Sequence, residues 1–549
     1  MKYNIRSIIL KVIPFVLIGI FFWFINKNLS IECKILINVY QAITKSLIYF
    51  SAFTLSIVGI VFCLFSSSRI LRIISNIIFS ICTGIEFLYI SLNKIGLSYE
   101  DILLVKQNLG FNLHDQAFYT FKKEIVLALT VSILFFVSVM YINKLLKPSF
   151  HKGYATTYLV AVICVYLIIN NSQANRLAFP GPTKIPALIS YSFTKNLYVG
   201  PREAVNIDVT SKPEIDHIIW VVDESVRSDH LSINGYNRPT TPVLNKLKNN
   251  TISLGNASSA AVCSDYSHYI MMTGARDYEI PSRANNIRKS PLIFQYAAKA
   301  NFNPILIYSP GYEDKPKGYL TKFDFKHIPN RVQTAMLHPE LQRFEHDIKS
   351  IAYLTEQIGK NEKTFTYFLK YGCHFHYEHA YPKSHKIFTP TQDPQDWNMV
   401  KKNELINSYD NAINYSVDHF FEILMKELKG KRFLIIYTSD HGQNILDHPE
   451  IKLTHCIKGK APKIMASVPM IILGDSLTIN NIQNNFTLST KSSHFDIFPS
   501  TLSMLGYDHK WIKSNYGSLG FLEQGSHPRY FFSGDIFGRS KCFKNQFDE

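Results

Sequence analysis

The chain has 549 residues, which is room for two to four domains, and a formal net charge of +16 at pH 7. Its hydrophobic residues, 46% of the total, are crowded into roughly the first third, which excludes a uniformly water-soluble protein. For the soluble remainder, anionic headgroups or phosphorylated glycolipids are better partners for the positive charge than nucleic acid, so we expect no nucleic-acid binding.

Five apolar segments near the start predict transmembrane helices. Most of them reach or approach the roughly 20 residues that cross a bilayer. They cover residues 12–25, 47–65, 73–92, 125–142 and 154–169. No small-residue cleavage site follows the first segment, so we expect it to be retained. Glu86, inside the third, is costly in lipid. It is expected to face the bundle interior or a wet groove, with plain structural pairing as the alternative.

Lysines and arginines orient these spans. They precede the first span and occupy the loops between the second and third and between the fourth and fifth, so the positive-inside rule makes these loops cytoplasmic. An odd number of spans then places the rest of the chain outside. The sequence thus predicts a transmembrane domain at 1–172, a bridging segment at the membrane surface at 173–212, in which "FPGPTKIP" is a turn-rich connector, and an outer domain at 213–549.

Short apolar runs in the outer domain predict an α/β fold. Each is rich in branched and aromatic residues, as in fully buried parallel strands joined by helical crossovers. The runs lie at 217–222, 304–308, 364–369, 432–438 and 468–473.

Acids and imidazoles follow several of these runs within a few residues. Asp223 and Glu224 follow the first run, Gly372-Cys373-His374 the third, and Asp440 with His441 the fourth. Ligands of open α/β sheets lie outside the carboxyl ends of the strands, so we expect these side chains to converge. Alone, Asp440 could cap a helix or turn, and each histidine could be an ordinary hydrogen-bonded residue. Their coincidence at separate strand ends favours a zinc-type ligand set.

Three stretches after the spans carry a family resemblance: "VVDESVRSDHLSINGYNRPTTP" (221–242), "TSDHG" (438–442) and "SHFDIFPSTLSMLG" (493–506). They resemble the membrane-bound phosphoethanolamine transferases of Gram-negative bacteria, members of the sulfatase and alkaline-phosphatase superfamily. The resemblance implies a five-helix membrane domain followed by an alkaline-phosphatase-like α/β domain in the periplasm. It also implies a monomeric inner-membrane enzyme that moves phosphoethanolamine from phosphatidylethanolamine to lipopolysaccharide through a zinc-activated covalent intermediate.

The same resemblance assigns the central residues. Glu224, Asp440 and His441 match the family's zinc ligands, and Ser264 lies where the family has its threonine nucleophile, which also binds zinc. A serine alkoxide on zinc can perform the same chemistry. Cys263 is an adjacent alternative nucleophile, which we rank below Ser264.

Two further histidines and two departures from the family complete the assignment. His374 and His455 match positions that bind a second zinc or the substrate phosphate, so one or two zinc ions are expected. Gln443 replaces an acidic residue after "DHG", and the excursion to His455 is longer than the family's. Cys263 has no partner at the matching downstream place. The disulfide pattern and the acceptor, whether lipid A phosphate, core heptose or another sugar, stay open.

Rival functions are a phosphoglycerol transferase or a sulfatase-like hydrolase acting on another envelope glycan, and a non-catalytic membrane sensor. A sulfatase needs a C/S-x-P-x-R element, whereas "CSDYSH" has neither the proline nor the arginine. A sensor has no need of a metal-ligand set beside a hydroxyl. A phosphoglycerol transferase is separated less cleanly, because it shares the five-span plan.

Overall fold

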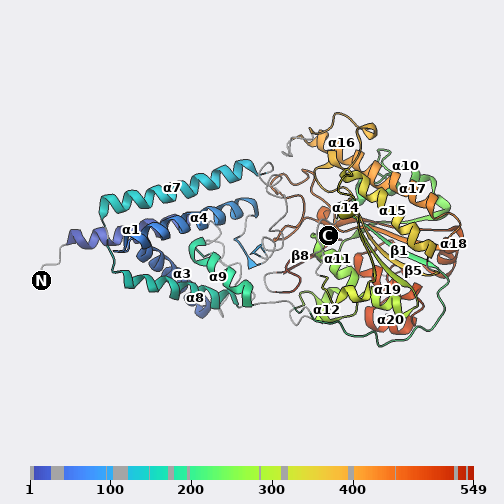
Figure 1. Ribbon diagram of the computed structural model, residues 1–549, viewed down its shortest axis with the longest axis horizontal. Coiled ribbons are helices and arrows are strands. Elements are labelled where there is room, and N and C mark those ends of the chain that lie inside the picture. Colours follow the sequence, from blue (N-terminus) through green and yellow to red (C-terminus); the bar gives the residue numbers. More distant parts are fainter. Residues whose placement is uncertain are drawn as a thin grey trace. The chain divides into compact units, whose positions relative to one another are not determined.

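The computed structural model describes residues 5–25, 43–93, 96–99, 101–102, 121–147, 149–170, 179–194, 198, 200–282, 286–310, 320–360, 362–393, 401–451, 453–524, 529–538 and 542–548. The chain forms two compact units (Figure 1). The first, called the membrane unit, comprises Met1–Asn196 with Gly538–Lys541, and the second, the sheet unit, comprises Leu197–Phe537 with Cys542–Glu549.

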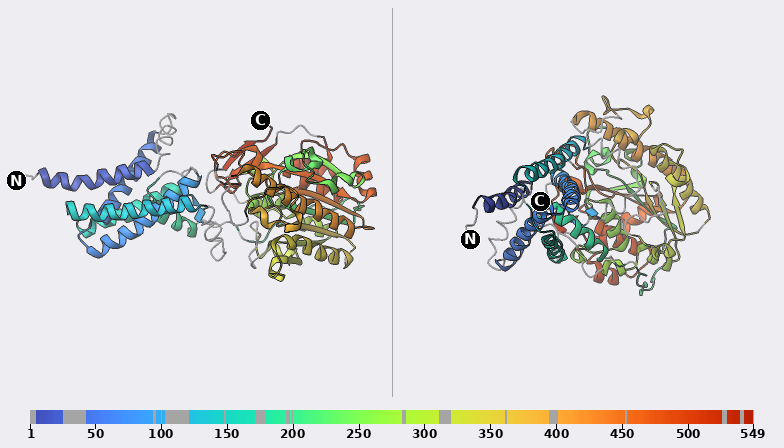
Figure 2. Two further views of the ribbon diagram at one scale, coloured as in Figure 1. Left: turned by 90° about the horizontal axis from the view of Figure 1, so that it is seen from above. Right: turned by 60° about the vertical axis from the view of Figure 1, so that its left-hand side comes forward.

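Helices occupy all five predicted spans of the membrane unit. Four stretches of the described residues are long and apolar enough to cross a membrane, and the first helix contributes a shorter one, Val12–Phe22. Helix α3 packs against α8, and α4 against α7 (Figures 1 and 2). The helices are α1 (Ile5–Ile25), α3 (Ile43–Leu64), α4 (Arg69–Asn93), α7 (Lys122–Leu146), α8 (Thr156–Asn170, preceded by the 3-10 turn Lys152–Ala155) and α9 (Gly181–Thr194).

Glu86 faces the interior of the membrane unit. Its side chain is 1% exposed, and its carboxylate lies 3.8 Å from Nζ of Lys184 on α9, which is fully buried. A buried charge is tolerated when an opposite charge is beside it. Of the expected environments, the structure therefore shows interior placement with a paired lysine.

The connector "FPGPTKIP" is not the run of turns that we predicted, because α9 begins inside it. Pro182 lies at the second helical position, where the missing N–H costs nothing. Pro186 lies inside the helix and cannot donate to the carbonyl of Pro182. The hydroxyl of Tyr158 donates to that carbonyl instead, at 2.6 Å, so the helix continues through the proline.

Seven strands within the described residues of the sheet unit form one sheet in the order β2-β7-β6-β1-β5-β3-β4. All five predicted runs are strands: β1 (His217–Asp223), β3 (Asn303–Tyr308), β5 (Thr364–Leu369), β6 (Phe433–Ser439) and β7 (Ser467–Gly474). The others are β2 (Thr251–Ser258) and β4 (Asn330–Gln333), and β8 (Tyr530–Gly534) pairs with β9 (Cys542–Gln546) in a second sheet.

The prediction that all five strands run parallel was wrong for β7. It pairs antiparallel with β6, whereas β1, β3, β5 and β6 pair in parallel. The described residues between β6 and β7 contain a 3-10 turn but no α-helix. A crossover helix is what returns a chain for parallel pairing, and a fully buried apolar run carries no signal of direction.

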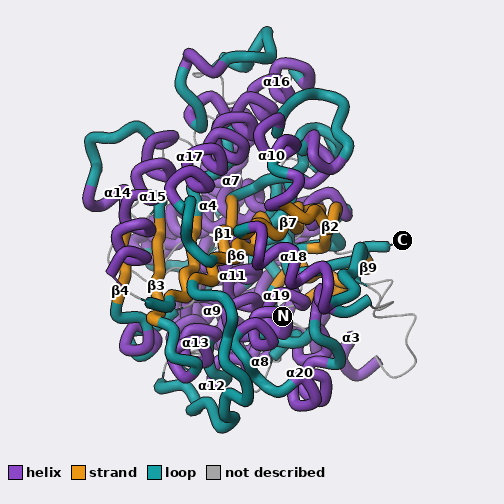
Figure 3. The backbone as a smooth tube through the Cα atoms, turned by 90° about the vertical axis from the view of Figure 1, so that its right-hand side faces the viewer, coloured by secondary structure: helices purple, strands orange, loops and turns teal. Residues whose placement is uncertain are grey.

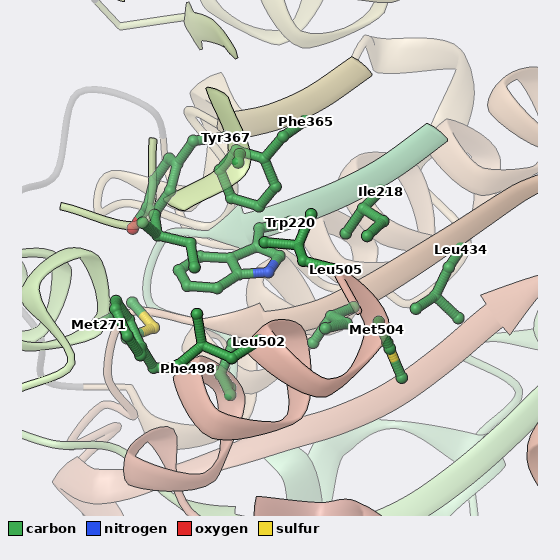
Figure 4. Close-up of a cluster of buried hydrophobic side chains, with 14 of the residues drawn as sticks. Ile218, Trp220, Met271, Phe365, Tyr367, Leu434, Phe498, Leu502, Met504 and Leu505 are labelled. Atoms are coloured by element: carbon green, nitrogen blue, oxygen red, sulfur yellow. The ribbon is translucent and has the colours of Figure 1, made fainter. Parts of the chain in front are cut away.

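Helices cover both faces of the sheet (Figure 3). Alternate residues of β1 enter two apolar clusters: Trp220 packs with Phe498 and Leu502 of α19 on one face (Figure 4), while Val221 packs with the helices of the other. The first face carries α11 (Ser264–Thr273), α13 (Ile293–Lys299), α18 (Ser476–Asn485), α19 (His494–Met504) and α20 (His509–Tyr516). The second carries α10 (Pro242–Lys246), α15 (Arg343–Lys360), α16 (Lys402–Ile413) and α17 (Phe420–Glu427). The short helices α12 (Asn286–Lys289) and α14 (Thr334–Leu337) complete the unit.

Candidate active site

The parallel ladder between β1 and β6 places two of the predicted ligands side by side. Asp223 pairs in register with Ser439, and the backbone N–H of Asp440 donates to the carbonyl of Asp223 at 2.9 Å. Glu224 and Asp440 are the next residues on the two strands. Their common place at the carboxyl edge therefore follows from the register of two buried apolar strands.

Asp440 is arranged to receive a cation. Its Oδ1 accepts hydrogen bonds from the backbone N–H groups of Ser225 at 3.0 Å and His441 at 2.7 Å. Its Oδ2 is buried and accepts no hydrogen bond within the described part of the chain. Burial, reinforced by the Glu224 carboxylate, raises the pKa of Asp440 well above its ordinary value. A metal ion at Oδ2 would supply the missing partner.

His441 presents a lone pair to the same point. Its Nδ1 donates to the carbonyl of Gly442 at 2.8 Å, so the neutral ring leaves Nε2 without a proton. Burial lowers the pKa of His441, which favours this neutral form. Nε2 lies 3.4 Å from a carboxylate oxygen of Glu224 and of Asp440 and 3.1 Å from Oγ of Ser264. Two carboxylates, an imidazole and a hydroxyl thus surround one position, a donor set suited to zinc.

Ser264 is the first residue of α11, so its hydroxyl lies at the positive end of a helix. Its Oγ is 3.4 Å from Oε2 of Glu224. The preceding residue, Cys263, forms a disulfide with Cys456. The sequence analysis left the disulfide pattern open, and the partner of Cys263 is this distant cysteine. The bond removes the thiol as an alternative nucleophile. The sequence could not show the pair, because the two cysteines are separated by 193 positions.

The long excursion after His441 returns His455 to the site. Asn444 ties the excursion together, because its backbone N–H donates to Thr454 at 2.7 Å and its side chain donates to the carbonyls of His448 and Ile451. The His455 ring stacks on the His441 ring with centroids 4.1 Å apart. Ligand atoms of Glu224, His441 and His455 lie within 4.8 Å of one another. The length of the excursion is therefore compatible with a place for His455 in the site.

His374 lies farther out. Its ring centroid is 6.3 Å from that of His455, and its backbone carbonyl accepts a hydrogen bond from the Arg343 guanidinium. The ring is half-buried. The structure thus brings five predicted residues close together, namely Glu224, Ser264, Asp440, His441 and His455, with His374 at their border.

The sequence analysis did not identify three residues that lie near this site, namely Lys370, His268 and Arg227. Lys370 follows β5 directly, the same position relative to its strand that singled out Glu224. His268 lies four residues after Ser264 on α11, with Nε2 3.9 Å from Oδ2 of Asp440. The helical spacing from Ser264 was the signal that would have found it. Arg227 forms a 2.5 Å ion pair with Asp447, so an acid does occur in the excursion, four residues beyond Gln443.

The sulfatase family model, described as "Sulfatase", matches residues 216–507, just over half of the chain. The chain belongs to the sulfatase family. The matched range contains the strands β1 to β7 and every residue of the candidate site.

Individual relatives are more specific. Kdo(2)-lipid A phosphoethanolamine 7''-transferase of Escherichia coli is 23% identical over 333 residues, 58% of this chain and 57% of the relative. The chain thus spans little more than half of that protein. Phosphoethanolamine transferase EptA of Helicobacter pylori is 24% identical over 425 residues, 72% of this chain and 75% of the relative. These relatives confirm the resemblance found in the sequence.

One solved structure extends the likeness to the membrane unit. The integral membrane protein EptA of Neisseria meningitidis matches 92% of this chain and 97% of its own, with a TM-score of 0.59 and 15% identity. At that identity the match shows a shared fold, and it confirms the predicted combination of a helical membrane region with a sulfatase-like α/β domain.

Proposed function

We propose that this sulfatase-family chain is an inner-membrane enzyme that transfers phosphoethanolamine from phosphatidylethanolamine to lipopolysaccharide, with the sheet unit in the periplasm and a monomer as the active form. The observation that carries the proposal is the Ser264 hydroxyl at the start of α11, 3.1 Å from the unprotonated nitrogen of His441 and 3.4 Å from Glu224. The names of the relatives support the transferred group and, for the Escherichia coli protein, the lipid A acceptor.

Glu224, Asp440 and His441, with Oγ of Ser264, are the residues that would hold a zinc ion. Bound there, zinc would lower the pKa of the serine hydroxyl and neutralise charge on the phosphoryl group. The buried, unsatisfied Oδ2 of Asp440 supports this assignment. His455 and His374 would hold the substrate phosphate or a second zinc ion.

Ser264 would act as the nucleophile in two displacements. Its Oγ forms a bond to the donor phosphorus as the phosphorus–oxygen bond to diacylglycerol breaks, and the serine proton is balanced by the proton that the glycerol oxygen gains. A hydroxyl or phosphate oxygen of the acceptor then attacks the phosphorus of the serine-linked phosphoethanolamine. The bond from phosphorus to Oγ breaks, and Oγ of Ser264 takes up the proton that the acceptor group loses. The N–H groups at the start of α11 favour the negative charge on the phosphoryl oxygens. Ping-pong kinetics follow from this sequence.

The decisive measurement is mass spectrometry of lipopolysaccharide from cells that contain the intact chain, Ser264→Ala or Ser264→Thr. We expect phosphoethanolamine on the glycan with the intact chain and none with Ser264→Ala. Ser264→Thr should retain transfer, because it keeps a hydroxyl and restores the residue of the resembling family.

Three results would contradict the proposal. Full transfer by Ser264→Ala would show that another group is the nucleophile. A glycan that gains phosphoglycerol, or one that loses sulfate, would identify the rival transferase or hydrolase. An unchanged glycan despite normal amounts of the intact chain in the membrane would exclude the transferase function.

A further inference from the structure

A fully buried ion pair lies directly behind Glu224. Nζ of Lys370 is 2.6 Å from Oδ2 of Asp223, and both side chains have 0% exposure. Asp223 is the last residue of β1, and Lys370 follows the end of β5, the neighbouring strand. The backbone N–H of Lys370 donates to Val222 at 3.0 Å, so the sheet itself brings the two side chains together.

Every oxygen of the Asp223 carboxylate has a donor. Oδ2 accepts from Lys370 and from the hydroxyl of Tyr437 at 3.1 Å, and Oδ1 accepts from the backbone N–H of Glu224 at 3.1 Å. Lys370 in turn donates to the carbonyl of Ser416 and lies 4.2 Å from the centre of the Phe420 ring. One oxygen of the Asp223 carboxylate is thus fixed by Lys370 and Tyr437, and the other oxygen fixes the backbone N–H of Glu224.

The loop after β5 closes on the same peptide. A Cβ placed on Gly372 would lie 2.0 Å from Oδ1 of Asp223 and 2.7 Å from the backbone nitrogen of Glu224. The N–H of Cys373 donates to the carbonyl of Glu224 at 2.9 Å. Both backbone polar groups of Glu224 are therefore fixed, the nitrogen by Asp223 and the oxygen by Cys373.

We propose that Asp223 and Lys370 are positioning residues: the lysine fixes the Asp223 carboxylate, which fixes the peptide of Glu224 and aims its side chain at the metal position. This inference rests on the metal site of the proposed function. A buried ion pair is often no more stabilising than an apolar pair of similar volume, so stability alone does not explain it. An apolar pair at these two positions would provide no acceptor for the backbone N–H of Glu224, whereas Asp223 provides one. Lys370 also cancels the charge of Asp223, so that Glu224 and Asp440 carry the two negative charges that match a divalent cation.

The test compares two double variants of the full chain in detergent. Asp223→Asn/Lys370→Met removes both charges but keeps an oxygen for the Glu224 N–H, whereas Asp223→Leu/Lys370→Met removes that oxygen as well. After zinc removal, zinc is titrated back in competition with a chromophoric chelator. We expect the leucine variant to bind zinc about 10- to 100-fold more weakly than the asparagine variant, the usual effect of losing an outer-shell partner. Thermal unfolding of the metal-free forms checks that both are folded.

Equal zinc affinity in the two folded double variants would overturn the inference and leave the proposed function intact. Failure of the unmodified chain to bind zinc would instead contradict the metal site itself.

Tyr437→Phe supplies a second comparison if the leucine variant does not fold. It removes one donor to Asp223, and we expect zinc affinity to fall about 2- to 10-fold, the effect of one hydrogen bond. Tyr507→Phe is the matched control, because this buried hydroxyl donates to the carbonyl of Tyr296 at 2.8 Å, outside the site. Equal zinc affinity in the two phenylalanine variants would also overturn the inference.

Discussion

The two ends of the strands β1, β5 and β6 differ. We call the side where these strands begin the amino edge and the side where they end the carboxyl edge. At the amino edge, the His217 imidazole hydrogen-bonds Thr364 at 3.0 Å, and the partly exposed Lys363 and Asp216 approach to 3.3 Å. At the carboxyl edge, Asp223, Glu224, Lys370, Asp440 and His441 are packed together, and all but Glu224 are fully buried. One edge thus carries ordinary polar contacts, and the other concentrates charge away from water.

This difference separates stability from chemistry in the sheet unit. The apolar residues between the edges fill the two clusters on the faces of the sheet, and that burial favours folding. Charges buried at one edge oppose folding unless each has a partner. We therefore expect changes at the carboxyl edge to affect metal binding and activity, and changes at the amino edge to affect stability.

Asp440→Asn should give the largest effect. It removes a negative charge that would hold the zinc ion, and the zinc ion is what would neutralise the phosphoryl group, an interaction of several kcal/mol, so transfer should fall by about 10³-fold or more. The melting temperature of the metal-free variant should stay the same or rise, because burial opposes ionisation of Asp440. Transfer assays and thermal unfolding after zinc removal measure the two effects. A metal-free variant that unfolds well below the unmodified chain would show that Asp440 chiefly stabilises the fold.

The Cys263–Cys456 disulfide joins the residues beside Ser264 and His455. Cys263→Ser/Cys456→Ser should lower the free energy of unfolding by about 2–4 kcal/mol and reduce transfer, because both site segments lose their link. Chemical denaturation and transfer assays provide the readouts. Cys542→Ser, at a cysteine of β9 that is not part of this disulfide, is the matched control and should change neither. Unchanged stability in the double serine variant would mean that the hydrogen bond from the backbone N–H of Cys456 to the carbonyl of Val262 is enough to join the two segments.

Two glycines with positive φ, one at each end of the strands, compare the two edges. Gly372, at the carboxyl edge, and Gly430, just before β6, both have positive φ, 52° and 81°. A Cβ on Gly372 would collide with Asp223, whereas a Cβ on Gly430 would meet nothing within 4 Å. Alanine should lower the free energy of unfolding by about 1–2 kcal/mol at Gly430, because of its positive φ, and by more at Gly372, where the Cβ also collides. Only Gly372→Ala should lose transfer, by about 10-fold, as expected when an outer-shell contact is disturbed. Equal transfer by the two variants would show that the close approach to Asp223 is unimportant.

What the sequence could predict follows the same division. The five apolar runs and the polar residues directly after them were visible, because strand burial and strand ends are local features of the sequence. The direction of β7 was not visible, since a fully buried strand has no alternation and direction depends on the return path. The disulfide, the return of His455 and the Lys370–Asp223 pair all depend on contacts between distant segments. The helix α9 was not visible because Pro186 lies inside it, and the carbonyl of Pro182, which Pro186 leaves without a donor, accepts from the hydroxyl of Tyr158 on another helix.

The amino edge should give the smallest effect, a pH-dependent loss of stability. Burial lowers the pKa of His217 to about 4, whereas an imidazole in the unfolded chain has a pKa near 6.5. Below pH 6.5 the unfolded state therefore binds a proton that the folded state does not bind. Stability is lost as the pH falls from about 6.5 towards 4. Between pH 8 and pH 5, the unmodified chain should lose about 1–2 kcal/mol more than His217→Gln, as measured by chemical denaturation. Transfer at pH 8 should be the same for both, because the imidazole lies at the opposite end of β1 from Glu224. Equal pH dependence in the two chains would mean that the pKa of His217 is the same in the folded and unfolded states. A loss of transfer at pH 8 would mean that the two edges are not independent.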